Sequence, residues 1–177
     1  RDFCLSRGLG DVYKRQGGKK SFIDKLQMVF DEGLYDPANE PDIAYPYLFS
    51  YFKGEEWRTQ KETQRLLDKY FTTKPDGIPG NDDTGTMSSW AIFNMIGFYP
   101  DCPGLPEYTL TTPVFDKVTI RLDPKWYKEK ELVIESNRAQ PGTLYINKVL
   151  LNGKKFNKYR ITHDELVHGQ HIYFDLK

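Results

Sequence analysis

The first half of the chain alternates between two apolar patterns, and both predict helices. Residues 19–33 and 55–71 carry apolar side chains at three- and four-residue spacing opposite a charged face, which indicates helices with one face in water. Residues 42–52 and 87–96 are apolar on nearly every side, which indicates buried helices. Ser21 is a candidate N-cap for the first helix. An α/α toroid, in which outer helices cover an inner ring, would produce this alternation directly, whereas a simple bundle would leave every helix half exposed.

Beyond Pro113 the apolar pattern becomes that of strands. The runs are short and rich in β-branched and aromatic residues, and Asn152-Gly153 between two of them is a strong hairpin signal. Residues 162–169 indicate one capped helical turn between two strands, with Glu165 three residues after Thr162. The sequence therefore predicts an α+β chain, with toroid helices in residues 17–112 and a small antiparallel β-region in residues 113–177.

Composition narrows the classes of function. The 177 residues include 25 Lys and Arg against 25 Asp and Glu, and no basic stretch is interleaved with aromatics, which argues against nucleic acid as a partner. No apolar run approaches the roughly 20 residues of a membrane span. Aromatics make up 15 %, which suits sugar-binding clefts but also ordinary cores. The two cysteines are too few for a disulfide framework, and Cys102 is expected to be a small buried hydrophobe.

The first sixteen residues differ from the rest of the chain. They show no hydrophobic period and no helix cap, and their ending "DVYKRQ" resembles translated sequencing-adapter read-through at the end of a gene fragment. The alternative is a basic arm. We favour a non-native segment in residues 1–16, and we therefore expect the natural protein to extend upstream.

A polar loop leads directly into the second apolar helix. In "DGIPGNDDTGTMSSW" the amide of Asn81 and the carboxylates of Asp82 and Asp83 stand among glycines and prolines. Glycine lets a backbone approach a ligand, and a helix N-terminus favours nearby negative charge. Such carboxylates can act as a general base or hold a hard cation. The structural alternative has about even weight: Asn81 and Asp82 form an Asx-turn and Asp83 caps the helix.

A second polar cluster opens the other apolar helix. Asn39, Glu40 and Asp42 precede "IAYPYLFSYF", so two acidic loops would lie on one rim of a toroid. The structural alternative, slightly preferred on these residues alone, is that Glu40 and Asp42 simply sit favourably in a first helical turn.

The order and content of these motifs resemble the C-terminal part of family 92 glycoside hydrolases, which are calcium-dependent, inverting exo-α-mannosidases. The resemblance runs from Gly17 almost to Lys177 and is carried by "NEPDIAYPYLFSYF", "GEEWRTQ", "DGIPGNDDTGTMSSWAIFNMIGFYPDCPGLPEY" and "ITHDELVHGQHIYF". It implies that residues 17–112 belong to an (α/α)6 catalytic domain. It also implies a mannose-containing glycan substrate, with α-1,2 the commonest linkage in the family, and a periplasmic, cell-surface or secreted parent protein.

The resemblance also assigns roles to residues. It implies that Asp83, or as second choice Asp82, is the general base, and that Asn39 and Glu40 help to bind Ca²⁺. Asn81 and Trp57, the latter expected near the same rim, are candidate substrate contacts. The family's general acid is a glutamate in an upstream motif that has no match between Gly17 and Asn39, so this chain alone is expected to be inactive. The alternative is a non-catalytic module that binds carbohydrate or calcium. The sequence does not indicate the oligomeric state.

Overall fold

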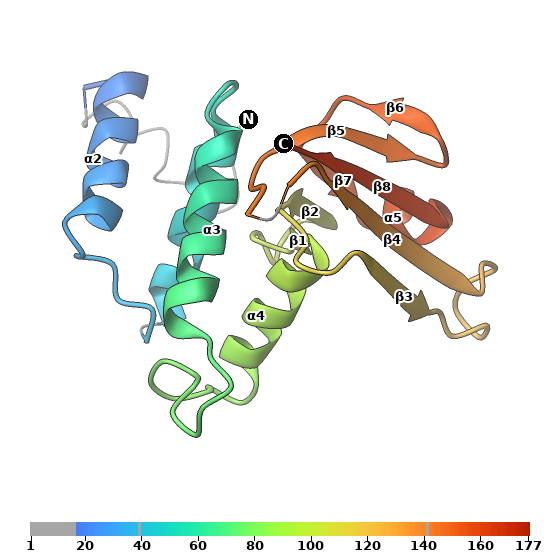
Figure 1. Cartoon of the computed structure of the whole chain (residues 1–177), viewed down its shortest axis with the longest axis horizontal. Helices are drawn as coiled ribbons and strands as arrows, with labels where there is room; N and C mark the ends of the chain where they lie inside the picture. Colours follow the sequence, from blue (N-terminus) through green and yellow to red (C-terminus); the bar gives the residue numbers. More distant parts are fainter. Residues whose placement is uncertain (1–16, 39, 141) are drawn as a thin grey trace.

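The computed structural model describes residues 17–38, 40–140 and 142–177. The longer helices form one side of the molecule, and two β-sheets with the short helix α5 form the other (Figure 1). The helical elements are α2 (Lys19–Asp31), the 3₁₀ helix η1 (Glu40–Tyr51), α3 (Glu56–Tyr70), α4 (Thr86–Ile96) and α5 (His163–His168). The strands are β1 (Phe98–Tyr99), β2 (Glu107–Leu110), β3 (Lys117–Arg121), β4 (Glu131–Arg138), β5 (Ile146–Leu151), β6 (Lys154–Phe156), β7 (Arg160–Thr162) and β8 (His171–Leu176). The prediction of a chain with both helices and sheets is confirmed.

The amphipathic helices α2 and α3 pack as their patterns predict. Each buries one side, and α2 does so through apolar residues such as Phe22 and Phe30. The cap prediction is wrong: Gly18 is the N-cap of α2 and makes no side-chain bond, because the helix begins two residues before Ser21. The buried side of α3 is unexpectedly polar. Glu62 is fully buried there, accepts a hydrogen bond from Gln27 at 2.9 Å and lies 3.2 Å from an Arg65 nitrogen.

The two apolar helices are less enclosed than predicted. The segment over residues 42–52 forms a 3₁₀ helix around Pro46 and fully buries only Pro46, Tyr47 and Phe49. Proline removes a backbone donor and does not fit inside an α-helix, which favours the tighter and more irregular form. In α4, Trp90 is 1 % exposed while Ile92 is 56 % exposed. Both helices therefore bury one side here and leave other apolar side chains half or largely exposed.

One of the two sheets is antiparallel throughout and the other is mixed, which corrects the prediction of a purely antiparallel β-region. One sheet has the order β1-β2-β7, and the other the order β3-β4-β8-β5-β6. All pairs are antiparallel except β4 with β8, which run parallel over Val133–Arg138. Strands also begin earlier than predicted, since β1 starts at Phe98. The short runs of strand residues could not show that β8 inserts between β4 and β5, because pairing order is decided by tertiary contacts.

Local signals in the β-region are confirmed. Asn152 and Gly153 have φ of 50° and 74° and connect β5 to β6 as a two-residue hairpin. Thr162 and Glu165 form a reciprocal capping box at the start of α5. Both motifs need only neighbouring residues, so the sequence suffices to predict them.

A buried ion pair joins the helical side to the sheets. The Asp101 side chain is 1 % exposed and accepts hydrogen bonds from Arg160 at 3.0 Å and from Thr109 at 2.6 Å. The Tyr51 hydroxyl of η1 donates to the same carboxylate at 2.9 Å. The Arg160 guanidinium also lies 4.0 Å from the centre of the Tyr51 ring. One carboxylate thus ties η1 to β2 and β7.

Cys102 is buried as predicted, but it is also disulfide-bonded, which the sequence did not predict. Its partner lies outside the described residues. None of the helices in the described part of the chain is long and apolar enough to cross a membrane.

Candidate functional site

The loop between α3 and α4 is built on two glycine positions. A Cβ at Gly77 would lie 2.0 Å from the Thr72 carbonyl oxygen, so only glycine fits this turn. Gly80 has φ of +66°, and a Cβ there would lie 2.6 Å from the Cβ of Ala38. Gly80 therefore brings the loop into direct contact with the segment that precedes η1.

Asp82 fastens the loop to α4. Its Oδ1 accepts hydrogen bonds from the backbone amide of Ser88 at 2.9 Å and from the Ser88 hydroxyl at 2.8 Å. Its backbone carbonyl accepts from Gly85 and Met87. The carboxylate thus satisfies an amide in the first turn of α4, as a capping side chain does. The structural alternative assigned this capping to Asp83, but Asp82 performs it.

Asp83 has a strained backbone and an uncommitted side chain. Asp83, Thr84 and Gly85 have φ of 48°, 60° and 96°, so three successive residues are left-handed. Non-glycine residues in this region cost about 1–3 kcal/mol each and cluster at functional sites. The half-buried Asp83 carboxylate makes no hydrogen bond or ion pair with any residue that the structure describes. It is thus free to act on a ligand or a water molecule.

A hollow adjoins this loop. Residues 72–80 and Asp82 line a space of about 760 Å³. Asp82 lines this hollow, whereas Asp83 does not. The two carboxylates therefore differ in both surroundings and bonding: Asp82 lines the hollow and accepts hydrogen bonds from Ser88, whereas Asp83 does not line it and has no partner among the described residues.

The second acidic segment lies at the same end of the helical layer. The contact between Gly80 and Ala38 brings the two segments together, as the sequence predicted. Asp36 and Asp42 flank this turn: the Asp36 carboxylate accepts from the Ala38 amide at 2.9 Å. Glu40 is exposed at the start of η1. Asn39 lies outside the described residues, so its predicted role in metal binding remains a prediction.

Three tyrosines that are far apart in the chain, Tyr35, Tyr47 and Tyr99, lie near one another and near acidic side chains such as Asp42 and Asp101. Burial raises the pKa of Tyr35 well above its ordinary value, with Asp42 the next contribution. Burial, then Asp101 and Glu40, raise the pKa of Tyr99 to about 12. The Tyr99 ring also stacks on Tyr47 at 4.7 Å. These phenols stay protonated at neutral pH and can donate hydrogen bonds. The sequence analysis did not identify them as one group, because they are far apart in the chain.

The raised tyrosine pKa values predict instability in alkali. In the unfolded chain tyrosine loses its proton near pH 10. The folded chain retains it longer at Tyr47, Tyr51 and Tyr99, whose pKa values burial raises. The contribution of these groups to the free energy of unfolding is therefore fully present below pH 10. Above pH 10 it falls by up to about 1.4 kcal/mol per pH unit for each such group. Urea unfolding at pH 8 to 11 tests this. Tyr99→Phe, which removes one titrating group, should flatten the dependence, and a constant midpoint would contradict the prediction.

Of the remaining predicted site residues, Asn81 is exposed in the loop itself. Trp57 is not brought to this site. It lies in the first turn of α3, while the loop follows the last turn, about 20 Å further along the helix (Figure 1). The Trp57 ring instead packs edge-on against Tyr145, with centroids 6.2 Å apart. The expected placement near the same rim is wrong, because α3 runs away from that rim before the loop begins.

The described residues fit a calcium ion only in part. Ca²⁺ takes about six to eight oxygen ligands. Among the described residues, no group of three or more His, Cys, Asp or Glu side chains could hold a metal ion. Glu40 offers one exposed carboxylate at the predicted place. Calcium binding therefore remains a prediction.

The Gly80 contact can be tested directly. Gly80→Ala is expected to lower the free energy of unfolding by about 1–3 kcal/mol, because the new methyl group meets Ala38 and the residue is left-handed. Gly104→Ala is the matched control, since a Cβ there has no neighbour within 4 Å and its φ is not positive. It should change stability by less than about 0.5 kcal/mol. Equal urea midpoints for the two variants would exclude the close approach.

Comparison with known proteins gives the family of the chain. Residues 5–177 match the model of the glycosyl hydrolase family 92 catalytic domain. A secreted, uncharacterized glycosidase of Arthroderma benhamiae is 29 % identical over 167 residues, which cover 94 % of this chain and 21 % of that protein. The chain thus spans about a fifth of the length of this relative.

Solved structures agree in fold. A family 92 α-mannosidase of Bacteroides thetaiotaomicron, solved in complex with mannoimidazole, superposes with a TM-score of 0.81 at 30 % identity, covering 90 % of this chain and 22 % of that one. An inverting family 92 mannosidase of the same organism gives a TM-score of 0.72 at 34 % identity over 85 % of this chain and 20 % of its own. The family model covers nearly the whole sequence, and this chain therefore belongs to glycosyl hydrolase family 92.

Proposed function

We propose that this chain is part of an inverting, calcium-dependent exo-α-mannosidase that removes terminal mannose, with α-1,2 linkage the first choice, from glycans. One observation carries the proposal within the family: the Asn81–Asp83 loop and the segment that ends at Glu40 meet through Gly80 and Ala38. The Asp83 carboxylate, which has no partner among the described residues, and the second acidic segment therefore lie at the same end of the helical layer.

In this proposal Asp83 is the general base. An ionised carboxylate without a partner can accept a proton from the water that attacks the anomeric carbon, on the face opposite the leaving group. Asp82 lines the hollow, but its Oδ1 already accepts two hydrogen bonds from Ser88. Asp82 therefore positions the loop, and it is the second choice as base. Exposed Asn81 is available for contact with the sugar.

Calcium would be held by Glu40 together with Asn39 and further oxygen ligands from the rest of the protein. When bound, the ion would orient neighbouring sugar hydroxyls and favour a distorted ring. The tyrosines near Glu40, among them Tyr99, would keep water away from the site and offer hydroxyl donors.

The remaining parts of the site would come from outside this chain. We propose that α2 and α3 are outer helices and η1 and α4 inner helices of an (α/α)6 toroid, which would cover the exposed side of Ile92. The general acid would be a glutamate in another part of the longer protein, so the chain alone would be inactive. The longer protein would be secreted, periplasmic or exposed on the cell surface, in line with the secreted Arthroderma relative.

The test uses a longer protein that contains this chain. It is incubated with α-1,2-, α-1,3- and α-1,4-mannobiose, with calcium or with a chelator, and the anomer of the released mannose is followed by NMR. The expected result is β-mannose as first product, fastest from the α-1,2 substrate, and loss of activity in chelator that calcium restores. Release of α-mannose would refute inversion, and full activity in chelator would refute the metal. Binding of mannosides without any hydrolysis would favour a non-catalytic carbohydrate-binding module instead.

A further inference from the structure

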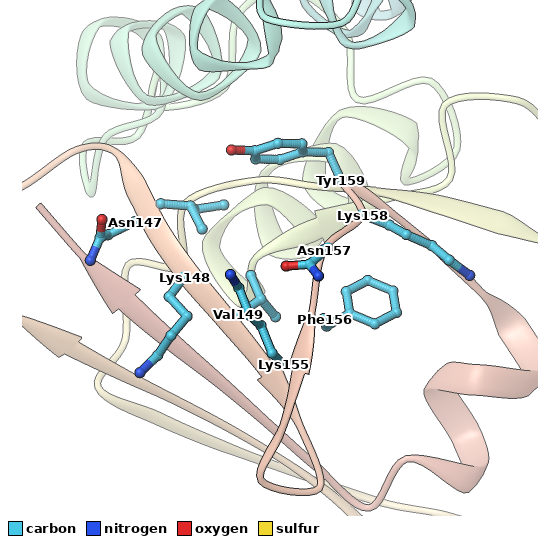
Figure 2. Close-up of a pocket in the computed structure, with 9 residues that line it drawn as sticks. Asn147, Lys148, Val149, Lys155, Phe156, Asn157, Lys158 and Tyr159 are labelled. Atoms are coloured by element: carbon cyan, nitrogen blue, oxygen red, sulfur yellow. The ribbon is translucent and has the colours of Figure 1, made fainter.

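A second hollow lies in the β-region, far from the loop described above. It lies between the start of β5 and residues 156–159, where the chain leaves β6 (Figure 2). β6 pairs with β5 only along Val149–Leu151, so the first half of β5 has no strand beside it on this side. The hollow has a volume of about 200 Å³. This is below the ~300–1,000 Å³ of drug-sized sites, so the ligand would be no larger than one substituted sugar.

The polar groups of this hollow come from one face of an extended segment. Alternate residues of an extended chain point the same way. Lys155, Asn157 and Tyr159 follow this spacing, and their side chains point to the gap, whereas the ammonium groups of Lys148 and Lys158 point away from it (Figure 2). Three polar side chains therefore converge on the hollow, Lys155 from β6 and Asn157 and Tyr159 from the segment that follows it.

These groups are not used by the fold. Among the described residues, no hydrogen bond or ion pair involves the side chain of Lys155 or Asn157. Lys158, whose ammonium group points away from the hollow, instead forms an ion pair with Glu165 at 3.0 Å. Burial, and secondarily Glu56, raise the pKa of Tyr159, so its hydroxyl stays a protonated donor at neutral pH. The hollow thus offers one free ammonium, one free amide and one phenol.

The charge of the lining selects the ligand. The nine lining residues include neither Asp nor Glu, and of the three lining lysines only Lys155 directs its ammonium group toward the hollow. A free ammonium with neighbouring donors favours an anionic group, and amide and phenol donors match sugar hydroxyls and anionic oxygens alike. Ile146 and Val149 line the hollow on the β5 side, but both are almost fully buried, so the contacts to a ligand would come mainly from the polar groups.

We propose that this hollow binds a monosaccharide that carries a phosphate, sulfate or carboxylate group, with Lys155 as the contact to the anion. The site lies on the β5–β6 side of the molecule, away from the loop before α4 (Figure 1). It does not depend on the proposed mannosidase activity, and either proposal can fail without the other.

The probe is mannose 6-phosphate, titrated into the ¹⁵N-labelled chain, with mannose and inorganic phosphate as comparison ligands. Chemical-shift changes are expected at residues 146–149 and 155–159, and the dissociation constant should be at least about fivefold lower for the sugar phosphate than for mannose. No saturable shift at these residues would overturn the site. If inorganic phosphate binds as tightly as mannose 6-phosphate, the hollow does not recognise the sugar, and that part of the proposal is refuted.

Two lysine variants separate the specific contact from general charge. Lys155→Gln should weaken binding of mannose 6-phosphate at least about fivefold. Lys154→Gln removes the same charge from the adjacent residue, which points to the other face of β6 and does not line the hollow. It should change the dissociation constant less than about twofold. Equal weakening by both variants would refute the site and indicate nonspecific attraction to surface charge. Both residues are exposed, and a melting curve of each variant checks the fold.

Discussion

Asp83→Asn is expected to reduce kcat on an α-mannoside by about a hundredfold to ten-thousandfold in a longer protein that contains this chain, because the variant keeps the shape of the side chain but cannot accept the proton of water. Substrate binding should be almost unchanged, so the loss appears in kcat and kcat/KM together. The fold should also be unchanged, since the Asp83 carboxylate has no partner among the described residues.

Asp82→Asn is the informative comparison. Its amide can keep one oxygen near Ser88 but loses the charge-assisted hydrogen bonds at 2.8 and 2.9 Å. Hydrogen bonds to charged groups contribute about 1.5–3 kcal/mol, so this variant should lose stability as well as part of its activity. If Asp82→Asn instead abolishes turnover without loss of stability, and Asp83→Asn stays active, the two roles are reversed.

Asp101→Asn is expected to lower the free energy of unfolding of the chain by about 3 kcal/mol, because it leaves the Arg160 guanidinium without its counter-ion. The effect should lie near the low end of the range for buried pairs, since the Arg160 side chain is 22 % exposed. The change also weakens the link between η1 and the sheets, as the Tyr51 hydroxyl bonds to the same carboxylate. Urea unfolding followed by circular dichroism measures the loss.

Asp24→Asn is the matched control for this change. Asp24 pairs with Lys20 at 2.6 Å, but the two side chains are 56 % and 90 % exposed. Exposed pairs contribute about 0–1 kcal/mol, because water screens them and ordering two long side chains costs entropy. A loss for Asp101→Asn no larger than for Asp24→Asn would show that the junction does not depend on the buried pair.

Sequence patterns predicted those features that neighbouring residues decide. The helical period of residues 19–33 and 55–71 is repeated every turn, so α2 and α3 are close to their predicted bounds. Asn152-Gly153 and the Thr162–Glu165 capping box were also correct, since each forms its contacts within four residues. The family resemblance was confirmed because its motifs are long and occur in order.

The candidate site divides in the same way. The sequence identified Asp82 and Asp83 and placed both acidic segments at one end of the helices. It did not reveal which carboxylate caps α4, because that depends on where Ser88 lies after three left-handed residues. It also misplaced Trp57, and it missed the tyrosines around Tyr35 and Tyr99, which meet only when distant elements pack together.

By itself, the amino-acid sequence determined the family, the periodic helices, the hairpin and the residue types of the acidic loop, because all of these are encoded in short runs of neighbouring residues. Only the tertiary structure decided the parallel pairing of β4 with β8, the buried Asp101–Arg160 pair and the approach of Gly80 to Ala38. Each of these joins residues far apart in the chain. Their pairing is selected by the free energy of packing the whole molecule, which no local pattern records.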